Sequence, residues 1–395
     1  MRNVNETVYW AFPSHFCIKR VKVMEHMDFN STNEKRILSR AAQLQNPVNG
    51  SLELLPLCNM NCDMCYIRLS RKEVEAQGGL RDAEEWIQLG KEMAQAGVLF
   101  LLLTGGEPLM FPGFQRLYRE LKSMGMILTI NTNGTLLDEE WADFFGQYKP
   151  RRINITLYGA DDIAYEKLCH YPDGFSKTIE AIQLLRERGV DVKINGSVTK
   201  YNRKDMKEIY RIGRELNVPV HMDTYMLPGN HERRLPLEQQ SRLLPEDAAA
   251  AEIDMQSMEM PSEVFQRYVQ EILVQIENRE ISYPDQITCL AGNCSFAIGW
   301  QGKMRPCVTF DEPAVSVFDK GFLPAWKEIS QVSKDLRLSA TCVKCPLRPV
   351  CKICPASAWL ETGRYDGVPE YLCRYAKELA RLLKEKGSCR IFESR

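Results

Sequence analysis

The chain has 395 residues, enough for one large domain and a smaller one. Its 51 lysine and arginine residues nearly balance its 52 aspartate and glutamate residues, giving a formal net charge of -1. This balance argues against nucleic-acid binding, which usually needs a basic excess or stripe. No apolar run approaches the roughly 18 residues that span a membrane, and the N-terminus has no continuous apolar signal region. We therefore expect a soluble, cytoplasmic protein that binds neither nucleic acid nor membrane.

Residues 1–48 are predicted to form an N-terminal extension, in which ETVYWAF and FCIKRVKV suggest a possible hairpin. Residues 49–228 follow with a repeating pattern of apolar strands and amphipathic helices. The strands are predicted at 52–57, 98–103, 127–131, 152–157, 191–198 and 218–225, and the helices at 81–95, 113–124, 138–146, 175–188 and 203–215. This alternation predicts an α/β fold with a parallel sheet, a partial (β/α)6 barrel.

Polar and glycine-rich turns follow four of the predicted strands. CNMNCDMC follows the first strand, TGGEP the second, NTNG the third and TLYGA the fourth. A single turn of this kind is common, but four at the carboxyl ends of parallel strands predict a binding site for a polar ligand.

The sixth predicted strand places His221, Asp223 and Tyr225 on one face, because side chains alternate along a strand. These three side chains are candidates for substrate contact or proton transfer. A hydrogen-bonded structural trio is an equally good interpretation.

Fourteen cysteines in a protein expected to be cytoplasmic indicate metal binding or catalysis rather than disulfides. Three of them, Cys58, Cys62 and Cys65, lie in the loop CNMNCDMC. Three thiolates can hold three irons of a [4Fe–4S] cube and leave the fourth iron open to another ligand. Structural zinc is the alternative, but it needs a fourth protein ligand, and none is near in sequence.

Residues 229–285 are predicted to be a helical bridge, and residues 286–395 a small, loop-rich domain in which a second group of eight cysteines lies between residues 289 and 373. Their spacing would suit iron–sulfur clusters or zinc bound by four thiolates. Cys17, Cys169 and Cys389 stand alone, and we interpret each as a small buried apolar residue.

The motifs together resemble those of radical S-adenosylmethionine (SAM) enzymes. The three-cysteine loop matches Cys58, Cys62 and Cys65, and the Gly-Gly-Glu-Pro motif matches Gly105, Gly106, Glu107 and Pro108. The resemblance implies that SAM chelates the open iron and is cleaved by the reduced cluster to a 5′-deoxyadenosyl radical, which abstracts a substrate hydrogen. It also implies a low-potential electron donor of the flavodoxin or ferredoxin type.

The same resemblance assigns contacts with SAM. Groups of the Gly-Gly-Glu motif would orient its amino group, and Asn131 and Thr156 are candidates for its ribose and carboxylate. Asn195 or Ser197 on the fifth strand is a further candidate. One departure is Met64, since the residue before the third cysteine is commonly aromatic in this family.

The C-terminal cysteines resemble those of the SPASM domain, which carries two auxiliary [4Fe–4S] clusters and would bring the total to three. The resemblance implies two ligand sets with no open iron, and therefore a role in electron transfer. The spacing before Cys354 is one residue shorter than usual in the family. Auxiliary cluster I would take Cys289, Cys294, Cys307 and Cys354, and auxiliary cluster II would take Cys342, Cys345, Cys351 and Cys373.

Three activities fit this resemblance. Maturation of a ribosomally made peptide, by a thioether or carbon–carbon cross-link, is favoured because most SPASM enzymes act on peptides. Formylglycine formation in a sulfatase is disfavoured, because Val308 follows Cys307 where such relatives usually have aspartate. Oxidation of a small molecule such as a tetrapyrrole or an amino sugar is the third. A non-enzymatic electron carrier would need neither the Gly-Gly-Glu motif nor the barrel.

Overall fold

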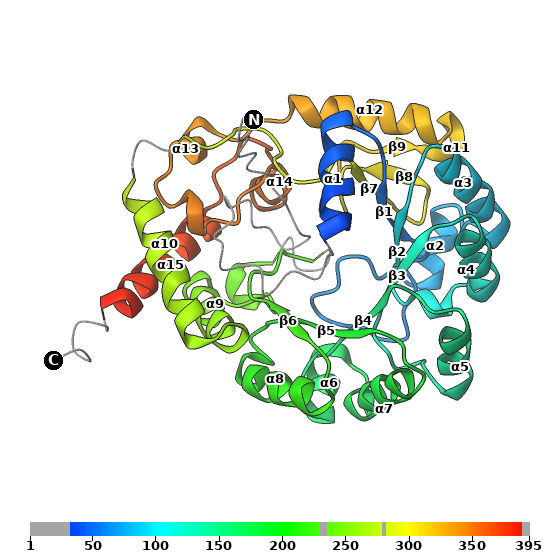
Figure 1. Ribbon diagram of the computed structural model, residues 1–395, viewed down its shortest axis with the longest axis horizontal. Coiled ribbons are helices and arrows are strands. Elements are labelled where there is room, and N and C mark those ends of the chain that lie inside the picture. The colour runs from blue at the N-terminus through cyan, green and yellow to red at the C-terminus, as the bar shows by residue number, and fades with distance from the viewer. Residues whose placement is uncertain (1–31, 230–234, 279–281, 389–395) are drawn as a thin grey trace, which may run out of the picture. The chain divides into compact units, whose positions relative to one another are not determined.

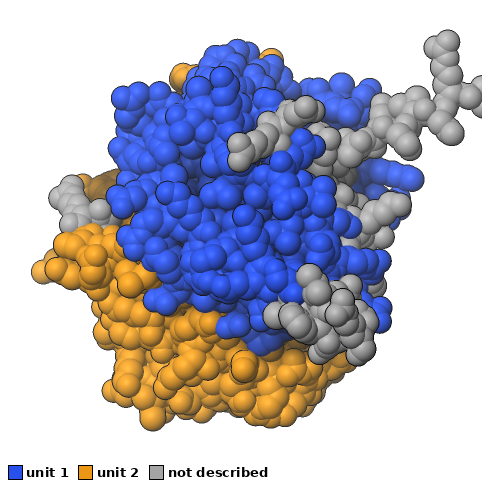
Figure 2. All heavy atoms as spheres, turned by 90° about the vertical axis from the view of Figure 1, so that its left-hand side faces the viewer, with its two compact units in different colours: residues 1–46, 245–294, 331–395 blue, residues 47–244, 295–330 orange. Residues whose placement is uncertain are grey.

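The computed structural model of the protein describes residues 32–229, 235–278 and 282–388. The chain divides into two compact units, coloured blue and orange in Figure 2. Unit 1 comprises residues 1–46, 245–294 and 331–395, and unit 2 comprises residues 47–244 and 295–330. None of the described helices combines the length and apolar character needed to cross a membrane.

Unit 2 is built on a curved sheet whose first six strands are parallel and lie side by side in chain order (Figure 1). This confirms the predicted α/β fold and its six-strand parallel core. The first strand ends earlier than predicted, although its chain stays paired with the second strand beyond Glu53. The strands are β1 (Asn49–Glu53), β2 (Phe100–Thr104), β3 (Ile127–Thr132), β4 (Arg152–Thr156), β5 (Val192–Ser197) and β6 (Val220–Asp223).

Amphipathic helices cover the outer face of this sheet (Figure 1). Alternate strand residues such as Leu103, Ile130 and Ile155 are fully buried, while residues between them are partly exposed. The sheet therefore buries its apolar face and leaves polar side chains on the other. The helices are α2 (Arg71–Ala76), α3 (Ala83–Gln95), α4 (Phe114–Ser123), α5 (Glu139–Gln147), α6 (Asp162–Cys169), α7 (Gly174–Glu187) and α8 (Met206–Glu215).

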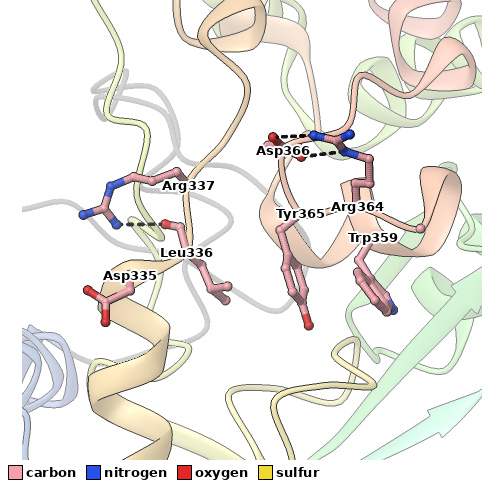
Figure 3. A pocket seen from close by; sticks show the side chains of 8 residues that line it. Asp335, Leu336, Arg337, Trp359, Arg364, Tyr365 and Asp366 are labelled. Atoms are coloured by element: carbon pink, nitrogen blue, oxygen red, sulfur yellow. Dashed lines mark hydrogen bonds and ion pairs between the residues drawn. The ribbon is translucent and has the colours of Figure 1, made fainter.

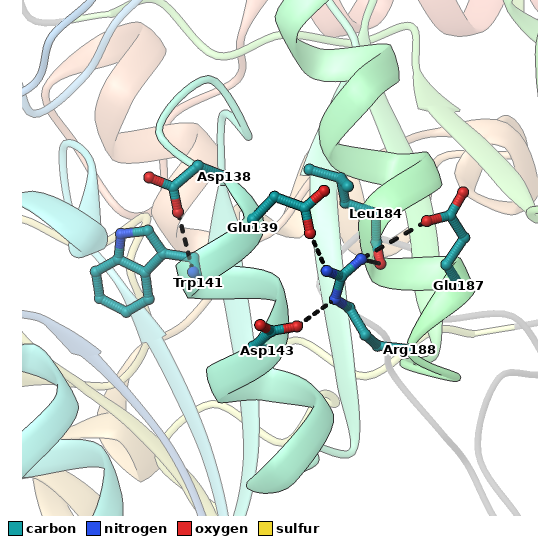
Figure 4. Close-up of polar contacts among 7 residues, drawn as sticks. All are labelled: Asp138, Glu139, Trp141, Asp143, Leu184, Glu187 and Arg188. Carbon is teal, nitrogen blue, oxygen red and sulfur yellow. Dashed lines mark hydrogen bonds and ion pairs between the residues drawn. The ribbon is translucent and has the colours of Figure 1, made fainter.

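Arg188, just after α7, joins that helix to α5 by a group of ion pairs (Figure 4). Its guanidinium donates to Glu139 and, over 2.7 Å, to Asp143, both on α5. These carboxylates are exposed to solvent, so the pairs orient two neighbouring helices and add little to stability.

Three short strands continue the sheet of unit 2 beyond β1. β7 (Ser295–Ile298) pairs parallel with β1, and β8 (Lys303–Arg305) and β9 (Val315–Ser316) follow in antiparallel register. The sequence analysis placed a domain boundary at residue 286. The compact units divide the chain elsewhere, because residues 295–330 belong to the same sheet as the barrel strands. Two helices follow: α11 (Val317–Lys320) and α12 (Phe322–Asp335).

Unit 1 is mainly helical. The predicted bridge contains α9 and α10, and both pack against the long C-terminal helix α15. The proposed hairpin of residues 6–23 lies outside the described residues, and the later part of that extension forms α1. The helices are α1 (Thr32–Leu44), α9 (Pro245–Glu259), α10 (Ser262–Glu277), α13 (Ala340–Val343), α14 (Pro355–Thr362) and α15 (Glu370–Ser388).

A buried ion pair ties α9 to the cysteine-rich segment of unit 1. Lys352 Nζ lies 2.9 Å from Glu252 Oε2, and the two side chains are 6% and 0% exposed. Gln256, one turn along α9, donates to the other carboxylate oxygen of Glu252 and to Tyr268 of α10. The charged residues are thus buried with their hydrogen bonds made, as interior charges require.

Candidate active site

The loop that follows β1 carries Cys58, Cys62 and Cys65 within eight residues of sequence. Cys65 N donates to Cys62 O over 3.1 Å, which closes the loop. Backbone N–H groups approach two of the sulfurs, with Met60 N 3.4 Å from Cys58 Sγ and Arg68 N 3.3 Å from Cys65 Sγ. Burial raises the pKa of Cys58 to about 12, and neighbouring thiols contribute to the rise. Such donors stabilise a thiolate when a metal displaces the proton.

The Gly-Gly-Glu turn after β2 fixes the start of this loop. Gly106 N donates to Leu55 O over 2.7 Å, and Glu107 N donates to Leu57 O over 2.9 Å. This pairing continues the β1–β2 ladder to the residue before Cys58. A Cβ on Gly106 would lie 2.2 Å from Leu57 O, and Gly105 has a φ of +147°. Glycine is therefore required at both positions by the close approach of the two backbones.

The side chain of Glu107 is fully buried and connects the turn to the end of β3. Its carboxylate accepts hydrogen bonds from Thr132 Oγ1 at 2.8 Å, Asn133 N at 2.9 Å and Leu109 N at 3.1 Å. Burial raises the pKa of this carboxyl to about 7, although the three hydrogen bonds favour its charged form. The carboxylate thus positions the loop after β3, and the predicted contact of this motif with SAM stays a prediction.

Asn133 joins that loop to the cysteines, a role that the sequence analysis did not assign to it. Its amide nitrogen donates to Asn59 Oδ1 over 2.9 Å and lies 3.7 Å from Cys58 Sγ. Asn59 in turn donates to Thr135 Oγ1 over 2.8 Å. The NTNG signal identified this turn, but only the fold shows that its second asparagine contacts the cysteine loop.

The predicted SAM-contacting residues lie in register on the inner face of the sheet. Asn131 is paired with Asn154, whose amide donates to it over 2.8 Å. In the next row, Thr156 on β4 pairs with Asn195 on β5, and Asn195 pairs with His221 on β6. Asn195 Oδ1 is buried and has no hydrogen-bond partner among the described residues. This row therefore offers a ligand an unused polar atom.

The proposed trio on the sixth strand is only partly brought together. His221 Nε2 lies 3.9 Å from Asp223 Oδ1, and Ser197 of β5 is in register with Asp223. The strand ends at Asp223, so Tyr225 lies in the following turn, where it is 6% exposed. His221 and Asp223 thus share the inner face, whereas the alternation argument does not extend to Tyr225.

Glu53 at the end of β1 is a further buried polar residue that the sequence did not reveal. It accepts a hydrogen bond from Tyr66 over 2.7 Å and one from Arg305 of β8 over 2.6 Å. Tyr66 follows Cys65 directly, so this contact anchors the end of the cysteine loop to the sheet. In the sequence, this residue could have been recognised as a glutamate within an otherwise apolar predicted strand.

Cys169, predicted to be an isolated apolar residue, lies beside the cysteine loop. It ends α6 and is fully buried, and its carbonyl oxygen accepts a hydrogen bond from Asn61 N of the loop over 3.0 Å. Burial raises the pKa of the Cys169 thiol far above its usual range, and the neighbouring thiols of the loop contribute to the rise. The fold thus brings a fourth sulfur to a loop that seemed to hold three.

A [4Fe–4S] cluster fits the donor set of this loop. Among the described residues, no three histidine, cysteine, aspartate or glutamate side chains converge on a single metal ion. A cube differs from a single ion in that each thiolate holds its own iron. Three soft sulfur donors on one loop, with an unused polar atom at Asn195, match the cluster and the SAM that the resemblance implies.

Four of the C-terminal cysteines are brought together within unit 1. Cys373 contributes to the raised pKa of Cys342, as does Cys345. Burial raises the pKa of Cys351 to about 12, with further contributions from Cys342 and Cys345. These four residues are the predicted ligands of auxiliary cluster II.

The predicted ligands of auxiliary cluster I are divided between the two units. Cys289, Cys294 and Cys354 belong to unit 1, whereas Cys307 follows β8 in unit 2. Cys294 Sγ lies 3.5 Å from Leu38 O of α1, and Cys354 caps α14 by accepting from Ser357 N. This ligand set stays a prediction.

A shallow cavity of about 390 Å³ lies in unit 1, between the segments before Cys342 and after Cys354 (Figure 3). Trp359 and Tyr365 stack with ring centroids 4.7 Å apart, and Arg364 is paired with Asp366. Arg337 lines the opposite side. Both arginines already have carboxylate partners, Asp285 for Arg337 and Asp366 for Arg364, so we assign the cavity no ligand.

Comparison with known proteins gives a consistent result. Residues 52–232 match the model of the radical SAM superfamily. The AdoMet-dependent heme synthase of Methanosarcina barkeri is 24% identical over 326 residues, covering 79% of this chain and 92% of that protein. Among solved structures, native anSMEcpe with bound AdoMet has a TM-score of 0.65 at 18% identity, covering 87% of this chain and 100% of that one. Streptococcus suis SuiB, solved with its precursor peptide SuiA, has a TM-score of 0.62 at 16% identity, covering 88% and 82%.

Proposed function

Because residues 52–232 match the model of the radical SAM superfamily, we propose that this chain is an oxidoreductase that uses SAM to abstract a hydrogen atom from its substrate. The observation that carries this proposal is the loop of Cys58, Cys62 and Cys65, held by backbone hydrogen bonds to the Gly-Gly-Glu turn. Three thiols on one rigid loop leave one position of a cube for an outside ligand.

When bound, the cluster and SAM supply a 5′-deoxyadenosyl radical. The protein's own residues hold the site: the three cysteines bind the cluster, and Asn133 and Glu53 fix the two ends of their loop. Asn195 offers its unpaired oxygen to SAM, together with Asn131, Thr156 and Ser197 on the same inner face. His221 and Asp223 lie next along that face, and we propose that they contact the substrate or move a proton.

The C-terminal cysteines are proposed to form a SPASM domain with two auxiliary [4Fe–4S] clusters. Support for cluster II is that burial raises the pKa values of Cys342, Cys351 and Cys373 and that Cys345 contributes to all three rises. Clusters with four protein ligands each would carry away the second electron of the oxidation. A low-potential flavodoxin or ferredoxin would supply the first.

A ribosomally made peptide is the proposed substrate, and a thioether or carbon–carbon cross-link the proposed product. The support is the likeness of fold to SuiB, a protein solved with its precursor peptide. Formylglycine formation fits less well, because Val308 follows Cys307.

Tetrapyrrole oxidation is the second candidate, and one observation favours it. The heme synthase of Methanosarcina barkeri matches this chain over 92% of its own length. The two candidates differ in their product, so one set of experiments separates them.

The test is anaerobic co-expression with short reading frames encoded beside this one, followed by peptide mass spectrometry. Loss of two hydrogen masses at one residue pair would establish the peptide cross-link. A matched variant, Cys342→Ala/Cys345→Ala, is expected to keep SAM cleavage and lose this product, because it removes only ligands of auxiliary cluster II, which is proposed to accept the second electron.

Unchanged peptides, together with haem formation when a tetrapyrrole precursor is supplied, would replace the peptide proposal by the second candidate. Product formation by the Cys342→Ala/Cys345→Ala variant at the normal rate would contradict the proposed role of auxiliary cluster II.

A further inference from the structure

The side chain of Asn202 joins the ends of β4 and β5 beyond their last paired row. The register of these two strands ends where Thr156 lies beside Asn195. The amide nitrogen of Asn202 donates to Tyr158 O over 2.7 Å and to Ser197 O over 3.0 Å. Each of these carbonyl groups lies two residues past the paired row. A single side chain therefore holds the two strand ends together where their pairing has stopped.

Asn202 is fully buried, and its amide group makes every hydrogen bond that an amide can make. Its oxygen accepts from Thr199 N at 2.7 Å and from Thr199 Oγ1 at 3.1 Å, while its nitrogen makes the two bonds to the strand ends. The orientation of the amide follows from these partners, because a backbone N–H can face only the oxygen. A buried group with all its partners fixes one local geometry.

The strand ends that Asn202 joins carry residues of the proposed SAM site. Thr156, Asn195 and Ser197 lie on the inner face of the sheet. Asn202 holds the backbone of Ser197 itself and that of the residue two past Thr156. Because Asn202 has no exposed surface, it can act on a bound ligand only through the backbone that it holds.

We propose that Asn202 is a positioning residue that sets the spacing between the ends of β4 and β5 and thereby the affinity of the site for SAM. The inference rests on the proposed binding of SAM along this inner face. Without the amide, the two carbonyl groups lose a donor, and the strand ends separate until those groups find another. The polar side chains of the paired row would then no longer converge on one ligand.

The test is SAM binding to the reconstituted full-length protein, measured by equilibrium dialysis and compared with thermal unfolding. Asn202→Ala removes the whole link, and Asn202→Ser keeps a polar group that is too short to bridge both carbonyls. We expect both variants to bind SAM about tenfold more weakly, as loss of a buried hydrogen-bonded link predicts. Their iron content is expected to match that of the wild type, because none of the hydrogen bonds of Asn202 reaches the cysteine loop.

Thr199→Val is the matched control, since it removes a buried hydroxyl from the same loop and leaves both bonds from Asn202 to the strand ends. It is expected to lower the unfolding temperature and to leave the affinity for SAM unchanged. Wild-type affinity in Asn202→Ala or Asn202→Ser would overturn the inference. So would an equal loss of affinity in Thr199→Val, because SAM binding would then follow stability alone. Absence of SAM binding by the wild-type protein would instead overturn the proposed function.

Discussion

At the scale of single residues, the site depends on buried polar groups that hold the cysteine loop rather than on the cysteines alone. Glu107 is the central one, because its carboxylate accepts hydrogen bonds from three donors while it is fully buried. Glu53 and Asn133 act similarly at the two ends of the loop. A buried polar group with all its partners fixes one local geometry, and a missing partner is costly.

The raised pKa of Glu107 predicts a specific pH dependence of stability. Its pKa rises from the ordinary 4.5 to about 7 in the folded protein. Between these values the unfolded chain has released the proton and the folded chain still holds it, so stability from this group falls as pH rises. The full effect is on the order of 3 kcal/mol.

Urea unfolding of the reduced apoprotein at several pH values between 4.5 and 7.5 measures this effect. Glu107→Gln is expected to flatten the fall in the free energy of unfolding relative to wild type. Equal slopes for the two proteins would show that the carboxyl keeps its ordinary pKa.

At the scale of elements, the close approach of the β1 and β2 extensions determines where the cysteine loop begins. Gly106→Ala places a methyl group 2.2 Å from Leu57 O, a backbone atom that cannot move without displacing Cys58. We expect this variant to bind SAM at least about tenfold more weakly, which corresponds to about 1.4 kcal/mol. SAM binding to the reconstituted protein, measured by equilibrium dialysis, gives the answer.

Gly146→Ala is the matched control, because the atoms nearest to its new methyl group would all belong to Arg188, the closest being Cβ at 3.1 Å. It should bind SAM as the wild type does. If Gly106→Ala bound SAM equally well, the backbone pairing would not position the loop.

The buried pair of Glu252 and Lys352 links elements of unit 1 and predicts a loss of stability. Glu252→Gln leaves Lys352 without its charge partner inside the protein and should cost roughly 3–5 kcal/mol. Glu252→Gln/Lys352→Met removes both charges and should recover most of it. Thermal unfolding of the three proteins distinguishes these outcomes, and full stability of the single variant would contradict the burial of the charge.

At the scale of the whole molecule, local sequence patterns predicted the parallel core. Apolar runs marked β2 to β6 and the helices α4, α5, α7 and α8, because each pattern depends only on neighbouring residues, whereas α6 was not predicted. The position of Cys58, Cys62 and Cys65 after a strand was predicted too, because the cysteines directly follow an apolar run in the sequence. β7 to β9 were not predicted, since these strands of two to four residues do not alternate with predicted helices, as the equally short β6 does.

Contacts between distant segments also escaped prediction. Cys169 is more than a hundred residues from Asn61, and Glu53 is far from Arg305, so no local spacing connects them. Asn133 stands in a recognised motif, but its contact with Asn59 depends on the fold. Such pairs are visible only once the sheet has brought its strand ends together.

The central claim is that Cys58, Cys62 and Cys65 hold a cluster that cleaves SAM. The most direct measurement is 5′-deoxyadenosine formation by anaerobically reconstituted protein with dithionite and SAM, quantified by mass spectrometry. The wild-type protein is expected to form it, and the three single alanine variants to form none, while Cys169→Ala retains the activity. Formation of 5′-deoxyadenosine by any of the three loop variants at the wild-type rate, or none by the wild type, would contradict the account.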